Sequence, residues 1–280
     1  MIQLIADSGS TTTDWAIVTK ETTHYIKSAG INPFHQDDAT IAHTLSHELC
    51  SQLTDTIPTH IYFYGAGCVG GSVNERLKAA LQHCFADAHI EIASDLLGAA
   101  RSLCGTQEGI AGILGTGANS CHYDGKRITH NVPPLGYILG DEGSGSSIGK
   151  AFLRRLLRGE LGKELLKEFY NQFHTDYTGV IGRIYREPAA NRFLASLSPF
   201  IASHIDNPTV QNIVQESVNE YLTRHIMQYN YHELPLHLTG SVAYYYRDII
   251  SKVAYSHGIE IGRITPTPIE GLITYHTTQQ

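Results

Sequence analysis

The stretch IADSGSTTTDWAIV, residues 5–18, sets an acid, a glycine and five hydroxyl side chains between two apolar runs. These runs, residues 2–7 and 14–19, are β-prone and predict the two arms of a hairpin. Glycine lets backbone N–H groups approach an anion closely, and Ser and Thr add donors without bulk, so the turn suits a phosphate. The same residue types also form ordinary solvated turns, and this stretch alone leaves both interpretations open.

A second strand–turn–strand pattern, GIAGILGTGANSCHYDG, lies further along the chain at 109–125. Its turn, GTGANS at 115–120, is again rich in Gly and Thr. Two such turns from two halves of a protein could hold a triphosphate from both sides. A carboxylate beside a phosphate is unfavourable unless a cation lies between them, so Asp7 indicates Mg²⁺, bound directly or through water.

The rest of the chain has the periodicity of an α/β protein. The first half predicts strands at 60–67 and 89–95 and helices at 39–53, 73–85 and 96–104. The second half predicts helices at 144–158, 161–173, 190–204, 208–230 and 244–258, a strand and glycine turn within 234–243, a strand at 259–265, and a short helix after Pro268. Asn207 and Pro208 are typical of an N-cap followed by the first helical residue.

Composition limits the class of protein. The net charge of −7 over 280 residues disfavours non-specific nucleic-acid binding, which needs clustered Lys and Arg. Five widely spaced cysteines without a CxxC pair predict reduced thiols. The first residues lack the basic and long apolar segments of a signal peptide, and no apolar run approaches the ~20 residues of a membrane span. We therefore expect a cytoplasmic protein.

Other nucleotide and metal patterns in the sequence are weaker than the two turns. No GxxxxGK[ST] is present, which excludes a Walker-type site. GAGCVG at 65–70 follows a strand, precedes a helix and leads to a second strand ending at Asp95, as in a dinucleotide-binding unit. That alternative leaves the two hydroxyl-rich turns unexplained. His43 and His47 lie at helical spacing, but no third ligand accompanies them, so an exposed helix face is favoured over a metal site.

Three further polar positions are candidates for chemistry. Asp95 ends a predicted strand, where it could serve either as a general base in phosphoryl transfer or as a helix N-cap. Asp141 and Glu142, in GDEGSGSSIGK at 140–150, could cap a helix and favour its N-terminus electrostatically, while the small residues after them would also allow close approach of a ligand. Asn32 stands in AGINPFHQD (29–37), which is either a plain turn or a binding segment.

Six segments taken together resemble one family. In chain order they are DSGSTTTDW, YGAGC, SDLLGA, GILGTGANS, LGDEGSGSSIG and LTGSVA. They are similar to the BadF/BadG/BcrA/BcrD-type ATPases, and most of all to the N-acetylglucosamine kinase branch, within the actin, sugar-kinase and Hsp70 superfamily. The resemblance covers nearly the whole chain.

The resemblance implies an α/β fold of two RNase H-like, actin-like ATPase lobes with ATP and sugar in the cleft between them. The lobes would be residues 1–107 plus 266–280, and residues 108–265. The activity implied is ATP- and Mg²⁺-dependent phosphorylation of the primary hydroxyl of an N-acetylated amino sugar, N-acetylglucosamine first. A homodimer is also implied.

The resemblance assigns residues as well. ATP would be bound by Ser8, Gly9, Ser10, Thr11, Thr12 and Thr13 of the first turn, by Gly115, Thr116 and Gly117 of the second, and by Gly240 and Ser241 on the adenosine side. Asp7 would lie near Mg²⁺ and Asp95 would be the catalytic base. The sugar would be bound by Asn32, Asn119, Gly136 and Asp141.

The chain departs from the family pattern at two positions in the first turn. Ser8 stands where many members have glycine, and Thr12 where many have Lys or Arg, which removes a charge partner for phosphate. Cys104 and Cys121 do not match the cysteine motifs of members that activate dehydratases. The alternatives are a non-kinase ATPase or BadF-type activator acting on a partner protein, and an NAD-dependent oxidoreductase using GAGCVG.

Overall fold

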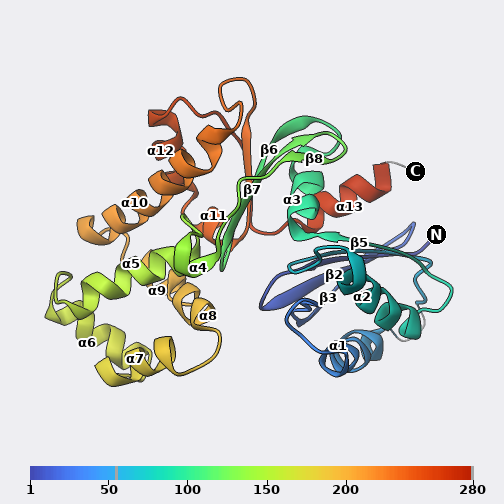
Figure 1. Cartoon of the computed structure of the whole chain (residues 1–280), viewed down its shortest axis with the longest axis horizontal. Coiled ribbons are helices and arrows are strands. Elements are labelled where there is room, and N and C mark those ends of the chain that lie inside the picture. The colour runs from blue at the N-terminus through green and yellow to red at the C-terminus, as the bar shows by residue number, and fades with distance from the viewer. Residues whose placement is uncertain (54–55, 279–280) are drawn as a thin grey trace. The chain divides into compact units, whose positions relative to one another are not determined.

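The computed structural model describes residues 1–53 and 56–278, which contain two five-stranded sheets flanked by helices (Figure 1). The chain divides into two compact units. Unit 1 comprises Met1–Glu108, Tyr123–Thr129 and Thr267–Gln280, and unit 2 comprises Gly109–His122 and His130–Pro266. The α/β class with two lobes, predicted from the sequence, is confirmed.

The sheet of unit 1 has the strand order β3-β2-β1-β4-β5. Its strands are β1 (Gln3–Ser8), β2 (Thr12–Val18), β3 (Thr23–Ala29), β4 (His60–Gly65) and β5 (His89–Ser94). The first three form an antiparallel meander, whereas β1, β4 and β5 are parallel. Ser8 pairs with Gly65, and Gly65 pairs with Ser94. The three parallel strands therefore end at one edge of the sheet, at the same level.

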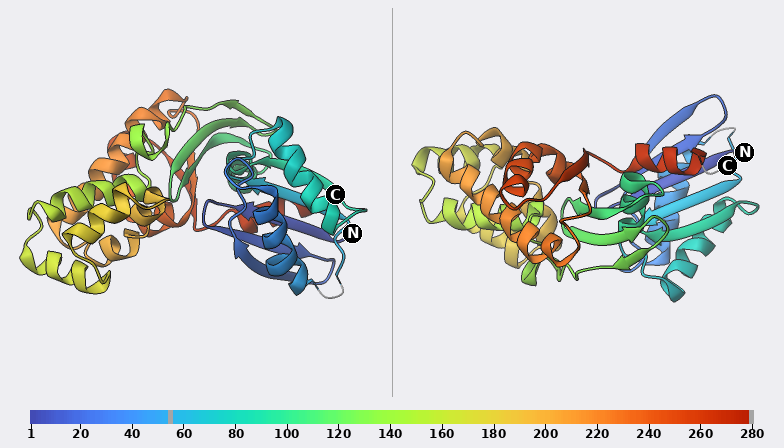
Figure 2. Two further views of the ribbon diagram at one scale, coloured as in Figure 1. Left: turned by 60° about the horizontal axis from the view of Figure 1, so that its bottom comes forward. Right: turned by 90° about the horizontal axis from the view of Figure 1, so that it is seen from above.

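Successive side chains along each strand point to opposite faces of this sheet, and each face is covered by its own hydrophobic core. Leu4 and Ala6 face the core formed with α1 (Asp38–Thr44) and α2 (Gly71–Cys84), while Ile5 faces the opposite core with α13 (Ile269–Thr278). Helix α3 (Asp95–Cys104) packs beside α13 on that second face. A π-helical turn, Leu45–Leu49, and a 3-10 turn, Cys50–Gln52, extend α1. Figure 2 shows α13, in red, lying beside the strands that begin the chain.

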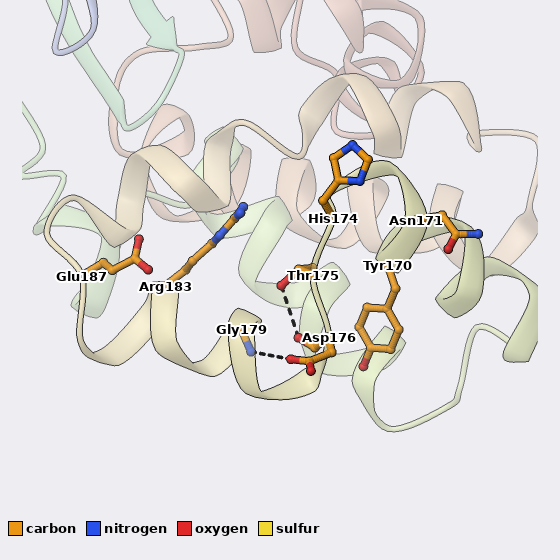
Figure 3. A pocket seen from close by; sticks show the side chains of 8 residues that line it. All are labelled: Tyr170, Asn171, His174, Thr175, Asp176, Gly179, Arg183 and Glu187. Carbon is orange, nitrogen blue, oxygen red and sulfur yellow. Dashed lines mark hydrogen bonds between the residues drawn. The ribbon is translucent and has the colours of Figure 1, made fainter.

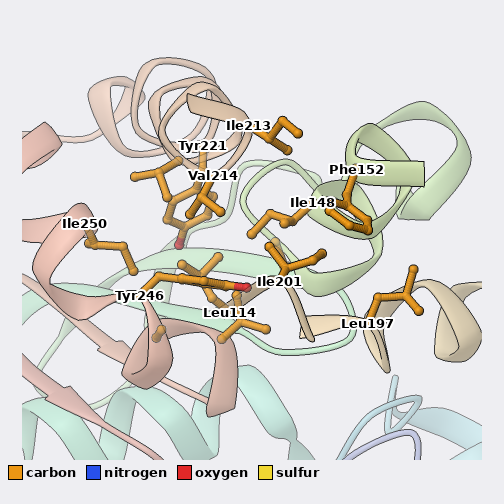
Figure 4. Close-up of a cluster of buried hydrophobic side chains, with 14 of the residues drawn as sticks. Leu114, Ile148, Phe152, Leu197, Ile201, Ile213, Val214, Tyr221, Tyr246 and Ile250 are labelled. Atoms are coloured by element: carbon orange, nitrogen blue, oxygen red, sulfur yellow. The ribbon is translucent and has the colours of Figure 1, made fainter. Parts of the chain in front are cut away.

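The sheet of unit 2 has the strand order β10-β9-β6-β7-β8. Its strands are β6 (Glu108–Leu114), β7 (Ala118–Asp124), β8 (Ile128–His130), β9 (Leu236–Thr239) and β10 (Ile261–Thr265). The helices of this half of the chain are α4 (Gly136–Leu139), α5 (Gly145–Leu157), α6 (Lys163–Gln172), α7 (Tyr177–Tyr185), α8 (Ala190–Ala195), α9 (Ser198–Ser203), α10 (Pro208–Arg224), α11 (Ser241–Tyr245) and α12 (Arg247–Ser256), with a 3-10 turn at Ile226–Gln228. Figure 4 shows Ile148 and Phe152 of α5 and Tyr221 of α10 in their shared core.

Several predicted elements have different bounds. The helix predicted at 190–204 is two helices, α8 and α9, because Pro199 in the first turn of α9 has no N–H to continue the hydrogen bonding of α8. The helix predicted at 244–258 breaks at Tyr246, which turns its ring into the core and donates from its hydroxyl to the Ser198 carbonyl at 3.1 Å. Strand β3 and helix α7 were not predicted.

The predicted start of α10 is confirmed. Asn207 is the N-cap, and its side chain accepts a hydrogen bond from the Thr209 amide at 2.9 Å, with Pro208 as the first helical residue. Within the described residues, no helix has both the length and the apolar character needed to cross a bilayer.

A buried polar cluster joins α13 to the sheet of unit 1. His276 stacks on Tyr62, with ring centroids 3.7 Å apart, and its Nε2 lies 2.8 Å from the Tyr64 hydroxyl. Arg101 donates to the same hydroxyl at 2.7 Å and to Glu91 at 2.6 Å. Burial lowers the pKa of His276 to about 4, so this ring is neutral in the folded protein at neutral pH.

Acid should therefore destabilise the protein through His276. Its folded-state pKa lies below the value of about 6.5 expected when unfolded, so stability is lost as pH falls from 6.5 towards 4, by about 3 kcal/mol in total. His276→Phe keeps the stacked ring but cannot titrate. Urea unfolding at several pH values should show a shallower acid limb for the variant. An equally steep limb would contradict this origin.

Candidate active site

The first hydroxyl-rich turn is a tight hairpin whose hydroxyls divide into two groups. The amide of Gly9 donates to the Thr12 carbonyl at 3.0 Å. Ser8 and Thr13 are buried, their hydroxyls lie 2.7 Å apart, and the Ser8 hydroxyl accepts from the Ile31 amide at 2.9 Å. These two hydroxyls therefore hold the turn together. Gly9, Thr11 and Thr12 are exposed, and Ser10 is half-buried.

The segment after β3 packs against this turn and against GAGCVG. Gly30 donates its amide to the Thr11 carbonyl at 3.0 Å, and a side chain at Gly30 would collide with the Gly9 carbonyl. Gly67 has a φ of 80°, and a Cβ there would collide with the side-chain oxygen of Asn32. The middle glycine of GAGCVG is thus required by the close approach of Asn32. The structure brings Asn32 to the carboxyl end of β4.

Two carboxylates stand at the same edge of the sheet. Asp7 is near the end of β1, and Asp95 follows β5 as the first residue of α3. Ser94 is the N-cap of α3 and accepts from the Leu97 amide at 3.2 Å, so the alternative that Asp95 is this cap is wrong. Asp95 accepts a hydrogen bond from the Leu96 amide at 2.8 Å.

Both carboxyl groups have raised pKa values, so their ionised forms are unfavourable. Burial, then the neighbouring Asp95 and Asp14, raise the pKa of Asp7 to about 8. Burial also raises the pKa of Asp95, against the lowering effect of the Leu96 amide. Lys27 pairs with Asp14 at 3.0 Å. A carboxyl group this costly to ionise would gain from a bound cation.

The residues present fit Mg²⁺ better than a metal held entirely by protein. The described part of the chain has no group of three or more His, Cys, Asp or Glu side chains placed to hold a metal. Mg²⁺ usually keeps several waters and takes one or two carboxylates together with substrate phosphates. Asp7, with Asp95 nearby, provides that kind of site.

The second turn is fixed by the start of α5. Gly115 donates to the Gly117 carbonyl at 3.0 Å. The carbonyls of Gly115 and Thr116 accept from the amides of Gly145 at 2.9 Å and Ser146 at 3.2 Å. The first amides of a helix lack partners within it, so here the turn satisfies them.

Asp141 is buried against the second turn. Its carboxylate accepts from the Ala118 amide at 3.3 Å, and its backbone φ is 57°. Burial raises its pKa, and the Ala118 hydrogen bond opposes that rise. Ser144, whose hydroxyl accepts from the Ser147 amide at 3.1 Å, is the N-cap of α5. The alternative that Asp141 caps this helix is therefore wrong.

Other predicted residues of unit 2 are placed as follows. Gly240 has a φ of 116°, and a Cβ there would collide with the Leu114 carbonyl, so its turn lies beside the end of β6. Ser241 is exposed at the start of α11. Asn119, on β7, accepts from the Asn131 side chain at 2.9 Å. Gly136 is exposed at the start of α4, with open space around its Cα. The structure thus gathers the second turn, Asp141 and Gly240.

A hollow of about 760 Å³ lies in unit 2 at the junction of α6 and α7, and Figure 3 shows the side chains that line it. It is lined by Tyr170, Asn171, His174, Thr175, Asp176, Gly179, Arg183 and Glu187. Asp176 caps α7 by accepting from the Gly179 amide at 2.7 Å, so this polar group already has a structural role. None of the predicted site residues lines this hollow.

Replacing Asp7 by Asn should stabilise the ligand-free protein at neutral pH. Wild-type Asp7, with its folded pKa raised to about 8, must take up a proton on folding at any pH between about 4 and 8. Asn removes that requirement. Since Asp7 is only half-buried, we expect a gain of roughly 2 kcal/mol, with a higher melting temperature at pH 7.

The control is acid pH. Well below pH 4 the Asp7 carboxyl is protonated in both the folded and the unfolded state, so the melting temperatures of wild type and Asp7→Asn should converge there. A variant that is less stable than the wild type at pH 7 would contradict the raised pKa.

The chain resembles known proteins in fold and, in one case, in sequence over nearly its full length. The sequence matches no known family profile and no curated protein. A solved structure from Porphyromonas gingivalis, described as "Putative N-acetylglucosamine Kinase", is 45% identical with a TM-score of 0.95, over 98% of each chain. One from Chromobacterium violaceum with the same description is 18% identical with a TM-score of 0.78, over 98% of each chain.

A more distant similarity shows the fold alone. A ROK family protein from Streptococcus pneumoniae is 14% identical with a TM-score of 0.51, over 100% of this chain and 99% of its own. The family assignment rests on the Porphyromonas gingivalis protein, because nearly half of its residues are identical to those of this chain over almost the full length. The chain belongs to the N-acetylglucosamine kinase-like branch of the BadF/BadG/BcrA/BcrD-type ATPases.

Proposed function

We propose that this protein is an ATP- and Mg²⁺-dependent kinase for the primary hydroxyl of an N-acetylated amino sugar, with N-acetylglucosamine as the first candidate. The observation that carries the proposal is the pair of carboxylates, Asp7 and Asp95, at the ends of two strands that flank β4. The description of the related Porphyromonas gingivalis protein supports the choice of substrate class.

Asp95 is proposed as the general base. Its helix is capped by Ser94, so its carboxylate is not needed at that position. The sugar hydroxyl transfers its proton to Asp95 as its oxygen forms a bond to the γ-phosphorus of ATP, and the bond to the ADP oxygen breaks. The pKa of Asp95 is raised by burial, which makes the carboxylate a stronger base than an exposed one.

Asp7 is proposed to hold Mg²⁺ directly or through water. When bound, the ion would neutralise charge on the phosphates. In the first turn, the exposed Gly9, Thr11 and Thr12 are the residues available to the phosphates, together with Ser10, while Ser8 and Thr13 hold the backbone in shape. Gly115, Thr116 and Gly117 would bind phosphate as well, and Gly240 and Ser241 would contact the adenosine.

The sugar is assigned to amide and carboxylate side chains. Asn32, Asn119 and Asp141 offer the donors and acceptors that sugar hydroxyls and an N-acetyl group require. Asp141 is held most firmly, because it is buried and its carboxylate is hydrogen-bonded to the second turn. Gly136 would contribute only backbone atoms.

The substrate class is tested with purified protein, MgATP and a panel of sugars. We expect ADP release to depend on an N-acetylated amino sugar, and the phosphate to appear on its primary hydroxyl by mass spectrometry. A non-kinase ATPase would release ADP without stimulation by any sugar, and an oxidoreductase would be stabilised in thermal-shift assays by NAD and not by MgATP. Either result would overturn the proposal.

Asp95→Asn should lower kcat by at least about 100-fold, because the variant cannot accept the proton. The affinity for MgATP, measured by calorimetry, should stay close to that of the wild type. Asp87→Asn makes the same change at an exposed carboxylate between α2 and β5 and is the matched control, with wild-type kcat expected. Full turnover by Asp95→Asn would show that another group is the base.

A further inference from the structure

One face of α10 holds the segment that carries Asp141. Ser217, Tyr221 and His225 follow one another at four-residue spacing along α10 and its C-cap, and all three are buried. Ser217 accepts from the Gly143 amide at 3.1 Å, and Tyr221 donates to the Asn119 carbonyl at 3.1 Å. Figure 4 shows the Tyr221 hydroxyl reaching from its helix towards the sheet.

The third contact of this face is a hydrogen bond between His225 and Glu142. The Nε2 atom of His225 lies 3.1 Å from a Glu142 carboxylate oxygen, and both side chains are largely buried. Arg224 lies near the other oxygen at 3.7 Å but is mostly exposed. Since Glu142 directly follows Asp141 and precedes Gly143, these contacts fix the backbone next to Asp141.

The second nitrogen of His225 shows that packing is not the only role of this ring. An ionised carboxylate can only accept, so Nε2 must be the donor in the hydrogen bond to Glu142. The other ring nitrogen, Nδ1, is buried and has no hydrogen-bond partner among the described residues. Leaving a buried polar atom unpaired costs about 1–3 kcal/mol. An apolar ring would avoid this cost, so packing alone does not explain a histidine at this position, whereas its hydrogen bond to Glu142 does.

The backbone of Asp141 needs such support. Its φ of 57° lies in the left-handed region, which residues other than glycine enter at a cost, although Asp does so more readily than most. Gly143, two residues later, packs so closely on Tyr221 that a Cβ there would lie 2.8 Å from the Tyr221 Cβ. The segment 141–143 is therefore shaped from outside by α10.

We propose that His225 is a positioning residue for substrate: through Glu142 it holds Asp141 in the conformation that binds the sugar. The inference rests on the proposed function, in which Asp141 contacts the sugar. His225 acts through a binding residue and takes no part in proton transfer. Its loss should therefore weaken sugar binding without slowing the chemical step.

Two substitutions of His225 separate positioning from packing. His225→Phe keeps a ring beside Tyr221, whose centroid is 5.4 Å away, and removes the donor to Glu142. His225→Gln loses the ring but offers an N–H donor. We expect His225→Phe to raise the sugar KM by about tenfold, which corresponds to the loss of one good hydrogen bond to the sugar. The kcat and the KM for ATP should not change. His225→Gln should stay near the wild type.

A purely structural role predicts the reverse order, because Phe fills the site and removes the unpaired nitrogen. Wild-type sugar KM in His225→Phe, or a larger rise in His225→Gln than in His225→Phe, would overturn the inference. His257→Phe is the matched control. His257 also bonds to α10, with its Nε2 2.7 Å from the Asn219 side chain, but on the exposed face.

Amide hydrogen exchange gives a readout that needs no substrate. Exchange at residues 141–143 should be faster in His225→Phe than in the wild type and unchanged in His225→Gln and His257→Phe. Unchanged exchange in His225→Phe would overturn the positioning role. A wild-type protein that phosphorylates no sugar would instead overturn the proposed function.

If His225→Phe does not fold, Glu142→Ala breaks the same contact from its other end and should raise the sugar KM in the same way. Unchanged sugar KM in Glu142→Ala would overturn the inference.

Discussion

Two partly buried carboxylates at one edge of a sheet repel each other, and unit 1 holds Asp7 and Asp95 in this way. The strands that carry them cannot slide apart, because β4 lies between them and pairs with both in register. The lysine nearest in register, Lys27, is paired with Asp14 and not with Asp7. This repulsion lowers the stability of the ligand-free protein and raises its affinity for a cation. Binding sites commonly combine these two properties.

The sequence predicted the large features well because they depend on local patterns. The hairpin at residues 5–18, the α3 and α10 helices and the second glycine turn all follow from hydrophobic periodicity and turn residues. The break between α8 and α9 was readable from Pro199. The edge strand β3 was missed, although Ile26 and Ser28 are buried between exposed neighbours, a pattern that alternation could have revealed.

Residue roles were harder to predict, since they depend on contacts distant in sequence. Nothing local distinguishes Ser8 and Thr13, which stabilise the first turn, from their exposed neighbours. Likewise, Ser94 and Ser144 take the capping positions that the neighbouring acids Asp95 and Asp141 could have filled. The contact between Glu142 and His225 joins residues 83 positions apart, and no pattern near either one indicates it.

The return of α13 to unit 1 has a consequence for synthesis of the chain. The whole of unit 2, Gly109–His122 and His130–Pro266, is translated before α13 (Ile269–Thr278). Until then Ile5, Ala16 and Tyr64 lack the apolar cover that Ile269 and Leu272 supply. The nascent protein therefore carries a hydrophobic sheet face that α3 covers but α13 does not while unit 2 is being made. During that interval a chaperone would find its binding surface on the α13 side of the first sheet.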